Sequence, residues 1–225
     1  MPENKLEVDS ILFNYGHRQL LTNIYLSCKT GEIAGLLGRN GCGKTTLLKI
    51  IFGTLPTLNK HIRINGNVYN EPYKSDNLLA YLPQNDFLPH NIKLHRLIDL
   101  YHKEPDKRET IKQDERIQKH LTKYAGELSK GELRYFELML LLQKDVKFML
   151  LDEPFSGIAP LYVEYIEELL RAHLGTKGFL ITDHDYQSVL RVSDRIILLA
   201  DGYARPINCM EELYQYGYIP ANALK

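Results

Sequence analysis

The chain has 225 residues, a length that fits one large α/β domain. Hydrophobic residues make up 44% and charged residues 25%, both close to the globular average, which argues against a chain disordered by composition. Lys plus Arg and Asp plus Glu each number 28, so the clustered basic excess of nucleic-acid-binding proteins is missing, and we expect no direct nucleic-acid binding.

The apolar stretches are short. Leu138–Leu142 and Phe148–Leu151 are among the longest, far below the ~20 residues that a helix needs to span a bilayer. The polar N-terminal segment does not resemble a secretory signal. Cys28, Cys42 and Cys209 show neither disulfide nor zinc-ligand spacing, which favours reduced thiols. We therefore expect a cytoplasmic protein that reaches a membrane only through a partner.

Expected strands and helices alternate along the chain, which favours an α/β fold with a largely parallel core sheet. In chain order they are strands at Leu6–Asn14, Leu20–Cys28 and Glu32–Leu37, a helix at Lys44–Phe52, strands at His61–Ile64, Asn67–Tyr69 and Leu78–Leu82, a helix at Glu132–Leu142, a strand at Val146–Leu151, a helix at Leu161–His173, and strands at Phe179–Thr182 and Arg195–Leu199. Turns are expected at Tyr15-Gly16 and Asn65-Gly66.

Little strand-like pattern occurs between Phe87 and Gly126, and charges of both signs crowd Lys103–Lys119, as on a solvated helical face. We expect residues 1–225 to form a single domain, with a helical subdomain inserted at about 87–142.

A glycine-rich segment lies between an expected strand and an expected helix. It reads Gly38-Arg39-Asn40-Gly41-Cys42-Gly43-Lys44-Thr45, which matches G-x-x-x-x-G-K-[ST] in the context that a phosphate-binding loop needs. Glycines let backbone N–H groups approach phosphates, and the helix start presents the positive end of its dipole. Lys44 offers a mobile cation to the β- and γ-phosphates, and Thr45 offers a hydroxyl to Mg²⁺. The loop alone fits ATPases, GTPases and small-molecule kinases.

Two acids, Asp152 and Glu153, end an apolar strand. Ligands of open α/β sheets lie beyond the carboxyl ends of the strands, so Asp152 could reach a Mg²⁺ held at the loop. Glu153 could act as general base on an attacking water. Taken alone, the sequence Asp-Glu-Pro is equally typical of a solvated turn at the end of a strand.

Ser129 and Glu132 have the spacing of a capping box at the start of a long helix. A serine-capped helix start with a glycine is also an anion site, although these residues do not define the anion.

These three segments, in this order, resemble the ABC (ATP-binding cassette) ATPase family. Gly38–Thr45 is similar to the family's Walker A motif, with Asn40 and Thr46 in place. Phe148–Glu153 is similar to its Walker B motif followed by the catalytic glutamate, and Leu128–Glu132 to its signature sequence LSGGQ. The resemblance covers roughly residues 5 to 205.

The resemblance implies roles for three further residues. Gln84 matches the glutamine that senses Mg²⁺ and the membrane partner, His184 matches the switch histidine near the γ-phosphate, and Tyr15 matches the aromatic residue that stacks on adenine. The complete expected site holds ATP and Mg²⁺. ATP is expected to contact Tyr15, Gly38, Arg39, Asn40, Gly41, Cys42, Gly43, Lys44, Thr45, Thr46, Ser129 and Gly131; the metal, Thr45, Gln84 and Asp152; and catalysis is expected of Glu153, His184 and Lys44.

The resemblance also implies a fold and an assembly: a RecA-like core of the P-loop NTPase type, an antiparallel β part near the N-terminus, and a helical subdomain between Gln84 and the signature. Family members work as head-to-tail dimers. In such a dimer Ser129 and Gly131 would cap the γ-phosphate of ATP bound to the partner cassette, which could be a second copy or a different chain.

Two positions depart from the family pattern. Lys130 replaces a usual glycine, where it could obstruct closure or help at a phosphate, and Glu132 is a milder change from glutamine. Ala159 stands where the family usually has aspartate, so we expect slower or less coupled hydrolysis.

The function expected first is the ATP-binding subunit of a transporter that pairs with a separate transmembrane permease on the inner face of the cell membrane. The alternative is a soluble ABC ATPase acting in translation or DNA repair. The chain has the length of one cassette and shows no sustained heptad repeat of a coiled coil, and both features favour the transporter subunit. A P-loop kinase would leave the Ser129 and His184 segments without a purpose. Cargo and direction of transport are left open.

Overall fold

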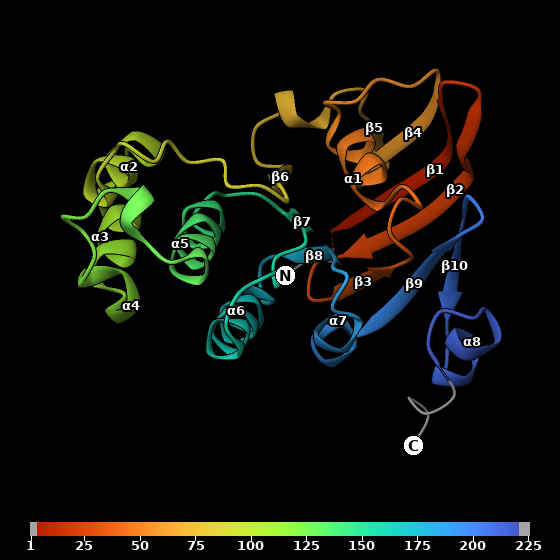
Figure 1. Cartoon of the computed structure of the whole chain (residues 1–225). Helices are drawn as coiled ribbons and strands as arrows, with labels where there is room; N and C mark the ends of the chain where they lie inside the picture. Colours follow the sequence, from red (N-terminus) through yellow and green to blue (C-terminus); the bar gives the residue numbers. More distant parts are fainter. Residues whose placement is uncertain (1–3, 221–225) are drawn as a thin grey trace.

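The computed structural model describes residues 4–220, in which a six-stranded and a four-stranded β-sheet pack together with helices around them (Figure 1). The two sheets share one hydrophobic cluster, because buried side chains such as Leu6 of the four-stranded sheet and Leu36 of the six-stranded sheet belong to it. A second cluster joins buried side chains of the six-stranded sheet, such as Leu151, to those of helices that connect its strands, such as Phe136.

The six-stranded sheet has the strand order β10-β9-β3-β8-β7-β6. Its strands are β3 (Ile33–Leu37), β6 (Leu79–Leu82), β7 (Phe148–Asp152), β8 (Gly178–Thr182), β9 (Arg195–Ala200) and β10 (Tyr203–Ile207). All neighbours pair in parallel except β9 and β10, which are antiparallel. Every residue of β3, β7 and β8 is buried, as expected of apolar runs in a sheet covered on both faces. The predicted mostly parallel core is therefore confirmed.

The four-stranded sheet is antiparallel and has the order β2-β1-β4-β5. Its strands are β1 (Lys5–Tyr15), β2 (Arg18–Lys29), β4 (Asn59–Ile64) and β5 (Asn67–Val68). The hairpin turn predicted at Asn65-Gly66 is present, and both residues have left-handed φ angles, 53° and 81°. This sheet is the antiparallel part expected near the N-terminus.

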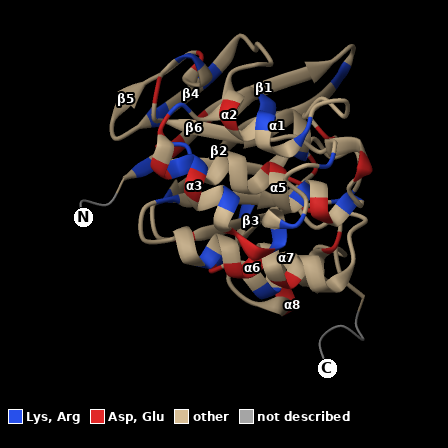
Figure 2. Cartoon of the chain, turned by 90° about the vertical axis from the view of Figure 1, so that its left-hand side faces the viewer, with Lys and Arg blue, Asp and Glu red and all other residues tan. Residues whose placement is uncertain are grey.

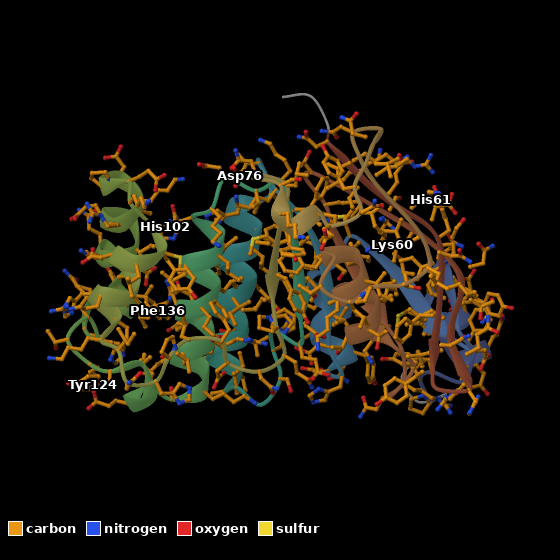
Figure 3. The ribbon with its side chains drawn as sticks, turned by 90° about the horizontal axis from the view of Figure 1, so that it is seen from above. Lys60, His61, Asp76, His102, Tyr124 and Phe136 are labelled. Atoms are coloured by element: carbon orange, nitrogen blue, oxygen red, sulfur yellow. The ribbon has the colours of Figure 1, made fainter. Side chains whose placement is uncertain are left out.

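The helices fall into two groups. Those of the sheet region are α1 (Lys44–Phe52), α6 (Pro160–His173), α7 (Tyr186–Val192) and α8 (Met210–Gln215). Helices α2 (Leu94–Tyr101), α3 (Pro105–Gln113), α4 (Glu115–Gln118) and α5 (Lys130–Leu142) lie to one side of the sheets (Figure 1). Within this second group, a ring nitrogen of buried His102 lies 2.9 Å from the carbonyl oxygen of Leu140, and Figure 3 shows His102 beside the helix that carries Phe136.

Some elements differ from the sequence expectation. β1 continues through Tyr15, so the turn predicted at Tyr15-Gly16 occupies Gly16 and His17. The sequence did not predict α7, β10 or α8, because elements of 7, 5 and 6 residues are too short to show a clear hydrophobic period.

Across residues 4–220, the structure contains no helix whose length and hydropathy would let it cross a membrane. Basic and acidic residues are interspersed along the helices, for example on α3 and α6 (Figure 2), in keeping with the formal net charge of zero.

Candidate active site

The glycine-rich loop connects β3 to α1 and needs glycine at two positions for different reasons. Gly43, the residue before α1, has a φ of 110°, which favours glycine. A Cβ atom on Gly38 would lie only 2.6 Å from the carbonyl oxygen of Leu199. Lys44 folds back over the loop, and its Nζ donates a hydrogen bond to the Gly38 carbonyl oxygen at 2.7 Å. The loop therefore has a shape suited to cradling an anion, and the ammonium group of Lys44 is hydrogen-bonded to the backbone of the loop.

Asp152, at the carboxyl end of β7, meets the loop through its side chain. Thr45 Oγ1 donates to one carboxylate oxygen at 3.1 Å, and Tyr81 donates its hydroxyl to the other at 2.8 Å. Burial raises the pKa of Asp152, and these two hydrogen bonds oppose that rise. Both donors are neutral, so the negative charge of Asp152 is left for a cation.

Glu153 follows in a left-handed conformation, with a φ of 52°, which costs a residue with a Cβ atom about 1 kcal/mol or more. Gln84 Nε2 donates a hydrogen bond to Glu153 Oε2 at 2.9 Å. His184 Nδ1 lies 3.5 Å from the same oxygen and 3.3 Å from Asp183 Oδ1. Two residues far from Glu153 in the sequence, Gln84 and His184, thus converge on its carboxylate.

A hollow of about 480 Å³ opens in front of these groups. It is lined by Leu20, Asn40, Gly41, Gly43, Lys44, Thr45, Thr46, Gln84, Glu153 and His184. The structure therefore brings together most of the residues that the sequence singled out for phosphate binding and catalysis. Asp152 lies behind Thr45 and is fully buried.

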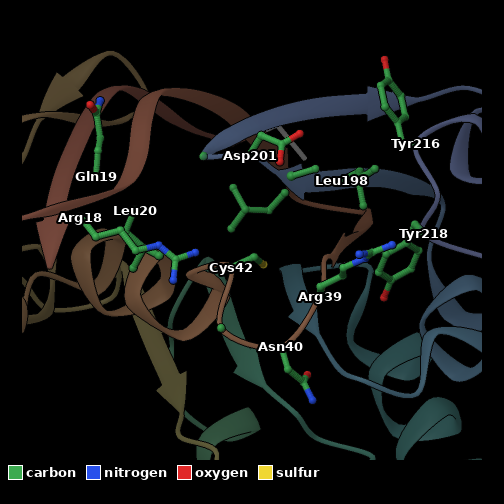
Figure 4. Close-up of a pocket in the computed structure, with 14 residues that line it drawn as sticks. Arg18, Gln19, Leu20, Arg39, Asn40, Cys42, Leu198, Asp201, Tyr216 and Tyr218 are labelled. Atoms are coloured by element: carbon green, nitrogen blue, oxygen red, sulfur yellow. The ribbon is translucent and has the colours of Figure 1, made fainter.

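A neighbouring hollow of about 570 Å³ shares Leu20, Asn40 and Gly41 with the first and extends toward the β9–β10 turn (Figure 4). Arg18 and Arg39 contribute guanidinium groups to its wall. Tyr15 lines neither hollow and is 77% exposed, so the structure leaves its ring free at the surface of the hairpin.

The side chain of Arg39 turns away from the phosphate cradle. Its guanidinium donates to the carbonyl oxygen of Gly217 at 2.7 Å and so joins the loop to the segment after α8. Any contact of Arg39 with phosphates would therefore come from its backbone.

Ser129 and Gly131 lie at the start of α5 and do not line the hollow. The predicted capping box is present: Glu132 N–H donates to Ser129 Oγ at 3.4 Å, and Ser129 N–H donates to Glu132 Oε2 at 2.8 Å. A Cβ atom on Gly131 would lie 2.7 Å from Tyr162, so the position also requires glycine for packing. A ring nitrogen of buried His120 lies 3.0 Å from Glu132 Oε1.

Lys130, the first departure from the family pattern, reaches across to the loop before α6. A Cβ atom on Gly157 would lie 2.6 Å from Lys130 Nζ, so the ammonium group sits over that glycine. Within one chain, Lys130 therefore bridges the signature segment and the loop that contains Ala159.

Ala159, the second departure, is the N-cap residue of α6, where no side chain caps the helix. An Ala159→Asp variant should gain a capping hydrogen bond and raise the free energy of unfolding by about 1 kcal/mol. Chemical denaturation checks the capping effect.

The same Ala159→Asp variant tests the expected effect of Ala159 on hydrolysis. Its steady-state rate of phosphate release should exceed that of the native protein if the aspartate restores coupling. Equal turnover in both proteins would contradict the expected slowing by Ala159.

Cys42 is half-buried in the loop, and burial raises the pKa of its thiol, an effect that Lys44 partly offsets. A raised pKa leaves less thiolate at neutral pH, so alkylation should be slow at pH 7 and accelerate as the pH rises toward that pKa. A maleimide should abolish ATPase activity, and ATP added first should protect it. Because Cys209 is exposed and reacts independently, the test uses a Cys209→Ser background. Full activity after complete Cys42 modification would refute the expectation.

Four residues of the site had not been singled out by sequence reasoning. Tyr81 and Asp183 hydrogen-bond within it, and Arg134 and Glu137 form a buried ion pair beneath it. Charged residues at buried positions of a helix are the signal that could have found the last two, since α5 otherwise buries apolar side chains on several faces.

A parallel sheet with a phosphate loop after its first strand and paired acids at the end of another defines a P-loop nucleoside triphosphatase. The model of the ABC transporter family matches residues 21–156. The chain belongs to the ABC transporter family and is an ABC-type ATPase.

Three proteins of similar sequence are each named as the ATP-binding protein of a transporter or transport system. An uncharacterised ABC transporter ATP-binding protein of Rhizobium meliloti is 37% identical over 202 residues, covering 84% of this chain and 74% of the relative. The lipopolysaccharide export system ATP-binding protein LptB of Escherichia coli is 30% identical, covering 84% of each chain. The zinc transport system ATP-binding protein TroB of Treponema pallidum is 30% identical, covering 86% of this chain and 77% of the relative.

Solved structures show the same fold. The ATP-binding subunit of an ABC transporter superposes with a TM-score of 0.80 at 22% identity, covering 95% of this chain and 93% of the other. A nucleotide-free cassette gives a TM-score of 0.79 at 21% identity, covering 96% of both chains.

Proposed function

We propose that this chain is the ATP-binding subunit of a transporter, which hydrolyses ATP–Mg²⁺ in a head-to-tail dimer and drives a separate membrane subunit. The observation that carries the proposal is the hollow of about 480 Å³ in which Lys44 and Thr45 face Glu153 and His184. A triphosphate lying on the loop would present its terminal phosphate to the strand-end acid, which is the geometry that hydrolysis requires.

Mg²⁺ suits this site. Thr45 Oγ1 and Asp152 Oδ1 are hard oxygen ligands 3.1 Å apart, and the hydrogen bonds to the Asp152 carboxylate come from the neutral hydroxyls of Thr45 and Tyr81. Thr45 would hold the ion directly and Asp152 through its carboxylate, with Gln84 as a third oxygen donor. The ion would supply charge neutralisation on the β- and γ-phosphates. Lys44 would exchange its bond with the Gly38 carbonyl for the phosphate oxygens.

Glu153 is the proposed general base. It takes a proton from water as the water oxygen attacks the γ-phosphorus and the bond to the bridging oxygen breaks, giving ADP and phosphate. His184 and Gln84 contact its carboxylate and orient it. Tyr15 is proposed to stack on adenine, for which its exposed ring is accessible.

Ser129 and Gly131 are proposed to complete the site of a partner cassette, since they lie outside their own chain's hollow at a capped helix start. The cassette would be held at the inner face of the membrane by the permease. As part of this proposal, residues 87–142 form the helical subdomain within a single domain of 1–225 and provide, with Gln84, the surface that meets the permease. Relatives named for lipopolysaccharide export and zinc transport support a transport role.

The proposal is tested by affinity purification from detergent-solubilised membranes of the native host, together with phosphate release from the purified complex. An integral membrane protein recovered in stoichiometric amount, and stimulating turnover, supports it. Recovery of ribosomes or DNA instead would favour the alternative, a soluble ABC ATPase of translation or repair.

A further inference from the structure

A buried ion pair on α5 lies beneath the catalytic end of β7. Arg134 is 4% exposed and Glu137 is fully buried, and Arg134 Nη1 donates to Glu137 Oε2 at 3.2 Å. Burying two charges is costly unless further hydrogen bonds compensate them, so their remaining partners reveal what the pair holds.

Arg134 uses its other terminal nitrogen, Nη2, on the main chain. It lies 2.9 Å from the carbonyl oxygen of Asp152, 3.2 Å from that of Glu153 and 3.3 Å from that of Gln84. One guanidinium group therefore links the backbone at Asp152 and Glu153 to the backbone at Gln84, whose side-chain amide contacts Glu153. A planar guanidinium with fixed donor directions holds such carbonyls in one relative arrangement, which a lysine ammonium does not reproduce.

Glu137 extends the link to the start of the helical insert. Its Oε1 accepts a hydrogen bond from Phe87 N–H at 2.7 Å, so the segment from Gln84 to Phe87 is held at both ends by the same ion pair. Since both charged residues belong to α5, any movement of that helix relative to the sheet is transmitted to both backbones.

We infer that Arg134, paired with Glu137, is a positioning residue for Glu153: it fixes the left-handed backbone at Glu153 and the Gln84 segment so that the carboxylate faces the attacking water. This inference rests on the proposed role of Glu153 as general base. Arg134 does not line the hollow, so it acts through the backbone without touching ATP.

The inference predicts a split between turnover and binding. An Arg134→Lys variant keeps the charge opposite Glu137 but loses the planar fork, so kcat should fall about tenfold or more, while KM for ATP and the Kd for ATP stay within about twofold. Arg116→Lys is the matched control, because Arg116 lies in the same helical region and pairs with exposed Glu168, and it should leave both constants unchanged.

A double-mutant cycle separates positioning of Glu153 from a general structural role. Single-turnover phosphate release is measured for native protein, Arg134→Lys, Glu153→Gln and the double variant. If Arg134 acts through Glu153, its replacement should cost less than about twofold once Glu153 is already glutamine. Equal losses in both backgrounds, or no loss in native protein, would overturn the inference.

Misfolding and failure of the proposed function have their own readouts. An Arg134→Gln/Glu137→Gln variant leaves no buried charge unpaired; it should bind ATP and unfold cooperatively, yet show the same fall in kcat. A normal kcat in this folded variant would also overturn the inference. If the proposed function itself fails, native protein releases no phosphate and Glu153→Gln does not differ from it.

Discussion

A Glu153→Gln variant should bind ATP as tightly as native protein and lose turnover by about 100-fold or more. In the native chain Gln84 Nε2 lies 2.9 Å from Glu153 Oε2. The glutamine amide keeps the size of the side chain and its oxygen can still accept this hydrogen bond, but the amide cannot take a proton from water. Because ATP is then bound without being consumed, the variant should accumulate as an ATP-bound dimer. Steady-state phosphate release and light scattering with ATP measure the two effects.

The control for this variant is Glu164→Gln, since Glu164 is exposed on α6 and lies outside the hollow around the phosphate loop. Its turnover should match that of native protein. Undiminished turnover of Glu153→Gln would remove Glu153 from the role of base.

A Lys44→Ala variant should lose ATP affinity itself. Removing a charge-assisted interaction of ~3 kcal/mol with the phosphates weakens binding by about 100-fold. Equilibrium binding of a fluorescent ATP analogue checks the result, with Lys103→Ala as control because Lys103 is exposed and does not line the hollow around the phosphate loop. Native affinity in Lys44→Ala would mean that triphosphates bind elsewhere on the molecule.

The contrast between these two variants is informative in its own right. In the proposed mechanism Lys44 holds the phosphates of bound ATP, so its loss should appear mainly in binding. Glu153 is proposed to act on the attacking water, so its loss should appear in turnover. Lys44 also holds the loop through the Gly38 carbonyl, so the thermal unfolding midpoint measured without nucleotide should shift slightly in Lys44→Ala and not in Lys103→Ala.

The sequence was sufficient for those parts of the site that are local. Gly38–Thr45 forms its cradle within one strand–loop–helix unit, and the Asn65-Gly66 turn follows from backbone preferences of two adjacent residues. The parallel core could be predicted because strand segments such as Phe148–Leu151 are continuously apolar, which a half-exposed sheet does not favour.

Long-range pairings were beyond the sequence. Nothing local shows that Tyr81 donates to Asp152, or that Arg134 spans from α5 to three carbonyl oxygens on two other segments. Only the packing of α5 against the sheet creates those contacts. Likewise, the side chain of Arg39 looked like part of the cradle by position, and only the path of the segment after α8 shows that it binds the Gly217 carbonyl.

The two departures from the family pattern take on a structural meaning. Lys130 lies over Gly157 and so fills space between the signature segment and the loop before α6, while Ala159 leaves α6 without a side-chain cap. Both changes act on the same loop, which in the proposed dimer lies close to the partner cassette.

A mixing experiment tests the central claim, that ATP is hydrolysed at sites shared between two cassettes. Lys44→Ala lacks a working phosphate loop, and Ser129→Arg blocks the signature that would serve the partner, so each variant alone should be inactive. The experiment uses conditions in which the native chain hydrolyses ATP without a membrane subunit. Mixing the two variants in equal amounts should then restore about a quarter of native turnover. Half of the dimers contain one copy of each variant, and each of these mixed dimers has one intact site out of two. A mixture no more active than its separate components would contradict the account.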